Sequence, residues 1–336
     1  MVKMDINNLN SLFYSKVDNV WSDSGLADFF TKIEPIQTAL AEKIVNLIPK
    51  EFIRVKELGS GADLTRWEII SKLKLKGRWQ VTLTDFSDKS IPSVKTFKDS
   101  ENFLFGSEKY NLLNPTPRLV KKDRYDAILA TYVFDSIWFP EDAHYEKISN
   151  NWHKVTYKLD VDKSYPKRNL LLKALKKASS IKRIQLDKFQ HIEIERKVDT
   201  IEINKVPYGG IISKYYKNKS NLSLNLPGGL INIVQEYFER QISPGGVFII
   251  GDMAVNSKKG FIPKDSPNDK VIYMEDYSTS GKVAKFKVED YGLAAIILKQ
   301  KGFAVELVTV EDFIKNSGYE IPLKVRDHWI MTVKKA

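Results

Sequence analysis

Two glycines and an acidic residue stand where a strand is expected to end. The stretch ELGSG places Gly59 and Gly61 directly after the apolar segment 52–58, with Glu57 two residues before the first glycine. Glycine lets the backbone approach a ligand closely because no Cβ is in the way. A helix expected over residues 64–73 would direct the free N–H groups of its first turn into the same space. On its own, this pattern also fits a plain tight turn.

The next expected strand, residues 79–87, ends on an acidic residue. Asp85 follows Glu57 by 28 positions. The first two strands of a doubly wound sheet are neighbours, and an acid at the end of the second can accept both hydroxyls of a ribose. The aromatic segment TYVFD closes a fourth strand at the same carboxyl edge. Together these features predict an adenosine-type ligand.

Strands and helices alternate around these residues. We expect strands over 52–58, 79–87, 102–106, 125–137, 247–255 and 327–335, helices over 34–47, 64–73, 88–97, 230–242 and 288–303, and a strand followed by a short helix within 304–319. This alternation predicts an α/β fold with a doubly wound, mostly parallel, seven-stranded sheet and helices on both faces.

A middle region breaks the alternation. Residues 169–184 have the pattern of an amphipathic helix, and residues 191–206 alternate as an antiparallel hairpin does. We therefore divide the chain into an N-terminal helical segment (1–50), a cofactor-binding half of the sheet (51–150), an inserted helix-plus-hairpin cap (151–225) and the other half of the sheet (226–336).

The positive charge is concentrated in this inserted region. The net charge is +11, and residues 151–220 carry 17 Lys and Arg against 7 Asp and Glu, a difference of +10. The ordinary explanation is a solvated lysine-rich surface. The alternative is a face for an anionic partner such as nucleic acid or an acidic protein.

Composition excludes several kinds of site. The chain has no cysteine, which rules out disulfides, thiolate metal sites and cysteine nucleophiles. Its four histidines, His144, His153, His191 and His328, lack metal-ligand spacing, so we expect no metal. There is no long apolar run and no signal-peptide pattern, which favours a cytoplasmic protein without a membrane partner.

The glycine turn departs from two common nucleotide motifs. Leu64 stands where a dinucleotide fingerprint has its third glycine, and the chain has no P-loop sequence. An acid two residues before the first glycine is instead typical of class I S-adenosylmethionine-dependent methyltransferases. VKELGSGADL and LTDFS resemble the first two cofactor motifs of those enzymes.

Further stretches resemble the MidA-like methyltransferases within that class. They run in order over about residues 14–320: DFFTKIEP (28–35), ELGSG, VFDSIWF (133–139), NWHKVTYKLD (151–160), GGLINIVQEYFERQISPGGVFIIGDMA (228–254) and VEDFIKNSG (310–318). Two departures stand out. Thr131 and Tyr132 replace the family's Asn-Glu or His-Glu, which argues against arginine methylation because a carboxylate there could hold a guanidinium. Asp252 keeps the acid of the family's DYG, but Met253 replaces its aromatic residue.

The resemblance implies S-adenosylmethionine as cofactor, S-adenosylhomocysteine as product, and a role for each matching residue. Glu57 would orient the cofactor's amino group, the Gly59–Ser60–Gly61 backbone would pass its methionine part, and Asp85 would bind the ribose. The remaining predicted cofactor contacts are Phe86 and Asn111 at the adenine, and Thr131, Tyr132 and Phe134 near the methyl group. Thr31 and Glu34 would lie on the substrate side, and Tyr132, Asp135 and His144 are candidate catalytic groups.

Each of these residues also has an ordinary structural interpretation. The glycines fit a plain turn, Glu57 and Asp85 fit solvated acids, Phe86 fits a core residue, and Tyr132 fits a buried structural tyrosine. Three functions follow. The first is methyl transfer to a protein side chain or to an oxygen or nitrogen of a small molecule. The second is a degenerate, non-catalytic cofactor-binding or interaction module. The third and weaker one is an RNA methyltransferase. The sequence does not identify the acceptor or the oligomeric state.

Overall fold

A computed structural model gives the architecture of the chain. It describes residues 33–61, 64–85, 101–110, 112, 124–134, 142–148, 151–160, 183–186, 191–198, 202–203, 206–215, 222–256, 273–277, 283–287, 289–320 and 328–336. The helices are α3 (Glu34–Leu47), α4 (Thr65–Lys72), α7 (Gly209–Tyr215), α8 (Gly228–Arg240), α9 (Tyr291–Gln300) and α10 (Val310–Asn316).

The strands of the large sheet are β1 (Phe52–Leu58), β2 (Arg78–Asp85), β3 (Phe103–Lys109), β4 (Tyr125–Thr131), β12 (Ile242–Val255), β16 (Phe303–Thr309) and β17 (His328–Lys335). Their order is β16-β17-β12-β4-β1-β2-β3, and the short β15 (Glu289–Asp290) adds to the end of β12. Strand β17 is antiparallel to both β16 and β12, and the other pairs along this path are parallel. The predicted seven-stranded, mostly parallel sheet is confirmed.

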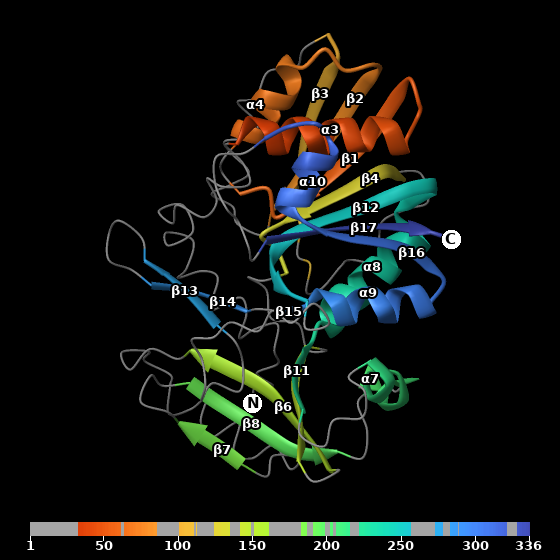
Figure 1. Ribbon diagram of the computed structural model, residues 1–336. Helices are drawn as coiled ribbons and strands as arrows, with labels where there is room; N and C mark the ends of the chain where they lie inside the picture. The colour runs from red at the N-terminus through yellow and green to blue at the C-terminus, as the bar shows by residue number, and fades with distance from the viewer. Residues whose placement is uncertain are drawn as a thin grey trace.

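Helices cover both faces of this sheet (Figure 1). On one face, α3, α4 and α10 pack on a core that includes Ile36, Val55 and Leu129. On the other, α8 and α9 pack on a core that includes Ile128, Tyr237 and Phe248. The sheet is therefore doubly wound, and strand order reverses between β1 and β4. In open α/β sheets, ligands bind at the carboxyl ends of the strands beside such a reversal.

Side-chain alternation along β1 decides which face each of its charged residues joins. Ile53 and Val55 point toward α3 and α4, and Glu57 follows them on that face. Lys56 points to the other side, where it is fully buried, with its ammonium 4.3 Å from the centre of the Tyr110 ring and 3.2 Å from Glu108. The strand thus carries its buried acid and its buried base on opposite faces.

A second sheet is antiparallel and has the order β11-β5-β6-β8-β7. Its strands are β5 (Ala143–Ile148), β6 (Asn151–Asp160), β7 (Arg183–Leu186), β8 (His191–Val198) and β11 (Leu222–Leu226). Strand β11 lies against β15, so this sheet adjoins the carboxyl end of β12 (Figure 1). Two short hairpins complete the described elements: β9 (Glu202–Ile203) with β10 (Val206–Pro207), and β13 (Tyr273–Tyr277) with β14 (Val283–Lys287).

The inserted region corrects two predictions. The helix expected over 169–184 is wrong at its end, because residues 183 and 184 begin β7; residues 161–182 lie outside the described part. The hairpin expected over 191–206 is also wrong, because β8 pairs with β6 and β7 rather than with the residues that follow it. Strand β7 precedes β8 by a few residues, where a helix is expected, and β6 lies well before β8 in the sequence, so local alternation does not reveal either pairing. The proposed division at residue 150 stays a prediction, although β5 pairs across it with β6.

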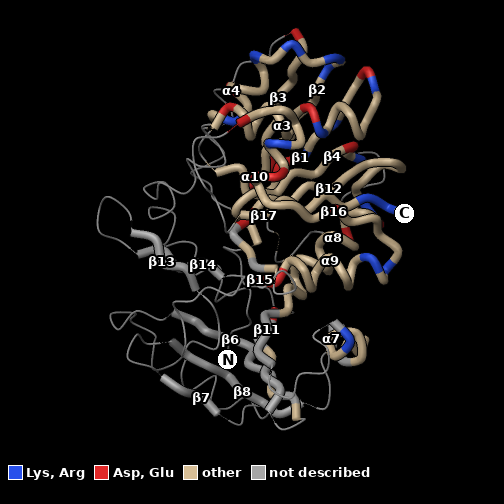
Figure 2. The backbone as a smooth tube through the Cα atoms, viewed as in Figure 1, with Lys and Arg blue, Asp and Glu red and all other residues tan. Residues whose placement is uncertain are grey.

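Other boundaries shift by a few residues. The fourth strand, expected over 125–137, ends at Thr131 because Tyr132 adopts a positive φ of 54°. The helix expected over 88–97 lies outside the described residues. Most side chains of the basic stretch 151–220 lie outside the described part as well, and the backbone there is largely grey in Figure 2, so its partner stays a prediction. Among the described residues, no helix is long and apolar enough to cross a membrane.

Candidate functional site

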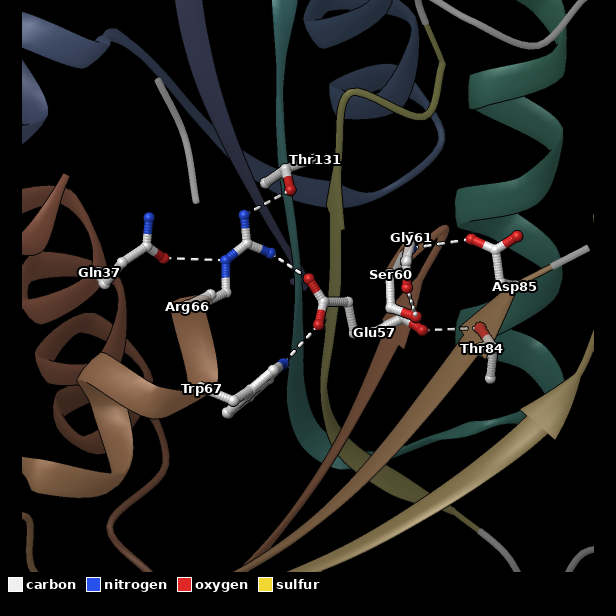
Figure 3. A network of polar contacts seen from close by, with 9 residues as sticks. All are labelled: Gln37, Glu57, Ser60, Gly61, Arg66, Trp67, Thr84, Asp85 and Thr131. Carbon is white, nitrogen blue, oxygen red and sulfur yellow. Dashed lines mark hydrogen bonds and ion pairs between the residues drawn. The ribbon is translucent and has the colours of Figure 1, made fainter. Parts of the chain in front are cut away.

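The glycine turn after β1 is tied to the end of β2. The Ser60 N–H donates to the Thr84 carbonyl at 2.9 Å, and the Thr84 hydroxyl donates to the Glu57 carbonyl at 2.6 Å. The Gly61 N–H donates to a carboxylate oxygen of Asp85 at 2.9 Å, and the other oxygen points away from the turn (Figure 3). The structure therefore brings together the two motifs that the sequence predicts to meet.

Both glycines of the turn need their residue type. Gly59 has φ 61° and Gly61 has φ 64°, a region that side chains with a Cβ rarely adopt. A Cβ on Gly59 would also lie 2.8 Å from a methyl group of Val133, in the turn after β4. Tight packing between the two turns thus explains Gly59 without a ligand, while Gly59 itself is exposed and Ser60 and Gly61 are half-buried.

Glu57 is held by the helix that follows the turn. Its carboxylate, 5% exposed, accepts from the Arg66 guanidinium and from the indole N–H of Trp67. Arg66 is 1% exposed and also donates to Gln37 Oε1 at 2.8 Å and to the Thr131 hydroxyl at 2.6 Å. Figure 3 shows the guanidinium between these three partners, which come from α3, β1 and β4.

Two opposing effects act on the Glu57 carboxyl. Burial raises its pKa above the ordinary value, and the adjacent Arg66 charge and the bonds from Trp67 and Arg66 lower it, with burial dominant. Without Arg66, the ionised Glu57 carboxylate would lose the largest interaction that offsets the cost of its burial. The charge state of Glu57 therefore depends on a residue on another element.

The turn after β4 is sharply constrained. Tyr132 is the one residue other than glycine with a positive φ in the described part of the chain, and such strain clusters at functional sites. Its N–H donates to the Gly251 carbonyl at 2.9 Å. The next N–H, of Val133, donates to Asp252 at 2.9 Å, and Asp252 also accepts from the Tyr291 hydroxyl. Asp252 is fully buried, so it fixes this turn from β12.

His328 lies beside Tyr132 at the same edge. It begins β17, pairs with Met253 near the end of β12, and its ring meets the Tyr132 ring edge-on with centroids 5.8 Å apart. Burial lowers the pKa of His328 to about 4. The imidazole is therefore neutral at pH 7.

This burial predicts an acid-sensitive contribution to stability. His328 binds its proton less readily when folded, so the unfolded chain takes up the proton first. The neutral His328 side chain therefore contributes fully to the free energy of unfolding above about pH 6.5, and this contribution is lost as the pH falls to about 4. We expect His328→Phe to reduce the difference in unfolding free energy between pH 7 and pH 4 by about 3 kcal/mol. Urea unfolding at both pH values measures this. His153→Phe is the control, and an unchanged difference in His328→Phe would contradict the assignment.

Solved structures share this architecture. A candidate methyl transferase from Burkholderia thailandensis, bound to S-adenosyl-homocysteine, matches with a TM-score of 0.50 and 8% identity, over 90% of this chain and 76% of its own. The chain has the class I methyltransferase fold. The glycine turn, Asp85 and the Tyr132 turn lie at the carboxyl edge of its sheet, beside β1 and β4. This edge is where open α/β sheets bind ligands.

Other structures with this fold match more loosely. Loganic acid methyltransferase with SAH gives a TM-score of 0.44 at 9% identity, over 94% of this chain and 96% of its own. An S-adenosylmethionine-dependent methyltransferase from Clostridium acetobutylicum gives 0.43 at 11%, over 96% and 98%. No family model matches the chain, and no curated protein matches its sequence.

The structure places the predicted site residues in four different settings. Glu57, Gly59, Ser60, Gly61, Asp85, Thr131 and Tyr132 gather at the carboxyl edge. Phe134 is fully buried and packs on Phe248 in the core, which accounts for it without a ligand. His144 lies on β5 in the antiparallel sheet, and Glu34 is exposed at the start of α3. Thr31, Phe86, Asn111 and Asp135 lie outside the described residues.

Sequence reasoning missed three residues of the site. Arg66 bonds the Glu57 and Thr131 side chains, Trp67 bonds Glu57 and Gln37 bonds Arg66, yet none of the three belongs to a recognised motif. A weak signal existed in TRW, where a charged residue stands next to a tryptophan directly after a glycine turn. The pattern does not reveal that Arg66 points inward.

Proposed function

We propose that this protein is an S-adenosylmethionine-dependent methyltransferase. The observation that carries the proposal is the hydrogen bond from Gly61 to Asp85, which joins the glycine turn and the acid at the strand reversal of a class I methyltransferase fold. The exposed backbone of the turn would pass the methionine part of the cofactor, and Asp85 would accept hydrogen bonds from the ribose hydroxyls. The cofactor supplies an activated methyl group.

The acceptor would approach from the Tyr132 side. The chain's own residues would align it in line with the methyl group, since the sulfonium is already reactive. Tyr132 would position the acceptor, and its strained turn next to a neutral histidine supports this role. We propose a protein side chain or an oxygen or nitrogen of a small molecule as acceptor, and the motifs quoted above support a MidA-like relationship.

Cofactor binding gives the direct test. We expect calorimetric titration to show micromolar binding of S-adenosylmethionine and S-adenosylhomocysteine, about −8 kcal/mol. Asp85→Ala should weaken both at least about a hundredfold, because two ribose hydroxyls lose a charged acceptor. Glu306→Ala, on the surface strand β16, is the matched control and should bind as the wild type does.

Two outcomes separate the rival functions. Absence of binding to folded wild-type protein contradicts the proposal. Binding without release of S-adenosylhomocysteine, across peptide, RNA and metabolite mixtures, favours the non-catalytic module instead.

A further inference from the structure

Arg66 is a buried cation with partners on three other elements. Its guanidinium contacts Glu57 on β1, Gln37 on α3 and Thr131 on β4, and its side chain is 1% exposed. Removing a guanidinium from water costs several kcal/mol, which is repaid only when its geometry and hydrogen bonds are good. The planar, forked guanidinium holds hydrogen bonds in several fixed directions at once, whereas a lysine ammonium is a single point on a flexible stem.

The two strand residues that Arg66 contacts immediately precede the two turns of the site. Glu57 stands two residues before Gly59, and Thr131 directly precedes Tyr132. Strands β1 and β4 are paired in parallel, with Glu57 opposite Leu129. Thr131 is two residues after Leu129, so Glu57 and Thr131 lie on the same face of the sheet. Arg66 therefore bridges the strand reversal, with the glycine turn on one side and the Tyr132 turn on the other.

Glu57 keeps acceptor capacity while it is held. A carboxylate has about four lone-pair sites, and the bonds from Arg66 and Trp67 use one on each oxygen. A cofactor ammonium can thus add to Glu57 without displacing Arg66. A shift of the Glu57 carboxylate toward that ammonium would move the guanidinium, which also bonds the Thr131 hydroxyl at 2.6 Å.

We propose that Arg66 is a positioning residue that couples the glycine turn to the Tyr132 turn, so that cofactor binding at one orders the acceptor side at the other. This inference rests on the proposed function. Val133 against Gly59 provides a second, apolar contact between the same turns.

The test uses Thr131→Val, which removes the hydroxyl but keeps the side-chain shape and leaves the pair of Arg66 with Glu57 in place. A 3-fluorotyrosine at position 132 reports on the turn by its fluorine NMR shift. Thr38→Val is the matched control, because the Thr38 hydroxyl bonds a helix carbonyl in α3, at 2.9 Å, away from the Arg66 contacts. Arg66→Lys is a second variant that keeps the charge but loses the fork.

We expect S-adenosylmethionine to shift the fluorine signal in the wild type and in Thr38→Val. In Thr131→Val, measured with the cofactor at a concentration that saturates this variant, the shift should fall to less than about a third of the wild-type value. In Arg66→Lys the shift should be lost and affinity should fall about tenfold. A full fluorine response in Thr131→Val and Arg66→Lys, with cofactor bound, would overturn the coupling and leave the proposed function intact.

Failure of the proposed function looks different. If wild-type protein does not bind S-adenosylmethionine, the fluorine signals of the variants are compared without ligand. A Thr131→Val signal displaced or broadened relative to Thr38→Val then supports the role of Arg66 in holding the Tyr132 turn. Identical signals in the two variants overturn it.

Discussion

Replacing Glu57 with leucine is expected to lower the unfolding free energy by about 3 to 5 kcal/mol, because the change leaves the Arg66 guanidinium buried without a counter-ion. The pair lies between α3, α4 and the sheet, with Arg66 1% and Glu57 5% exposed. The indole N–H of Trp67 would lose its acceptor as well. Denaturant unfolding followed by circular dichroism measures the change.

The double variant Glu57→Leu with Arg66→Met distinguishes the cost of an unpaired buried charge from the cost of losing the two side chains themselves. Removing both charges should restore much of the lost stability, since a buried ion pair replaced by apolar groups of similar volume is often neutral. Arg240→Met, which breaks an exposed pair with Glu236 on α8, serves as control and should change stability by less than about 1 kcal/mol. Equal losses in the single and double variants would show that the charge pairing is not the cause.

Asp252→Ala is expected to cost about 2 to 5 kcal/mol of unfolding free energy and to disturb the Tyr132 turn. The substitution removes the acceptor for the Val133 N–H and for the Tyr291 hydroxyl, and all three residues are buried. Each buried donor left unsatisfied costs about 1 to 3 kcal/mol. Thermal unfolding gives the stability, and the fluorine signal at position 132 reports the turn.

Tyr291→Phe isolates one of the two contacts. It removes the hydroxyl from α9 and leaves the bond from Val133 to Asp252, so it should lower stability by less than Asp252→Ala and leave the fluorine signal at position 132 in place. If Tyr291→Phe displaced that signal as much as Asp252→Ala did, the turn would depend on helix α9 rather than on the Asp252 contact to Val133.

Local signals were sufficient to predict the central sheet. Strands β1 and β2 are short apolar runs that end in a glycine turn and an acid, and both patterns are read within a few residues. The carboxyl edges of parallel strands then necessarily meet, so Glu57, the glycines and Asp85 could be placed together in advance.

Long-range packing accounts for what was missed. The bonds of Arg66 to Gln37 and Thr131 join residues 29 and 65 positions apart, and no local pattern encodes them. The early end of β4 depends on the positive φ of Tyr132, a residue type that ordinarily extends strands. The five-stranded antiparallel sheet pairs β6 with β8 across the intervening segment 161–190, and hairpin logic assigns strands only to their immediate neighbours.

Under the proposed function, the guanidinium beside Thr131 also limits how a substitution at position 131 could change the acceptor. A single substitution that places a carboxylate at position 131 would put it within reach of Arg66, whose Nη2 already lies 2.6 Å from the Thr131 oxygen. The new charge would be captured internally and would not be offered to a cationic acceptor. Loss of Arg66 first would leave Glu57 buried and unpaired. The residues at positions 66 and 131 are therefore coupled, because a carboxylate at position 131 would pair with Arg66 for as long as Arg66 is present.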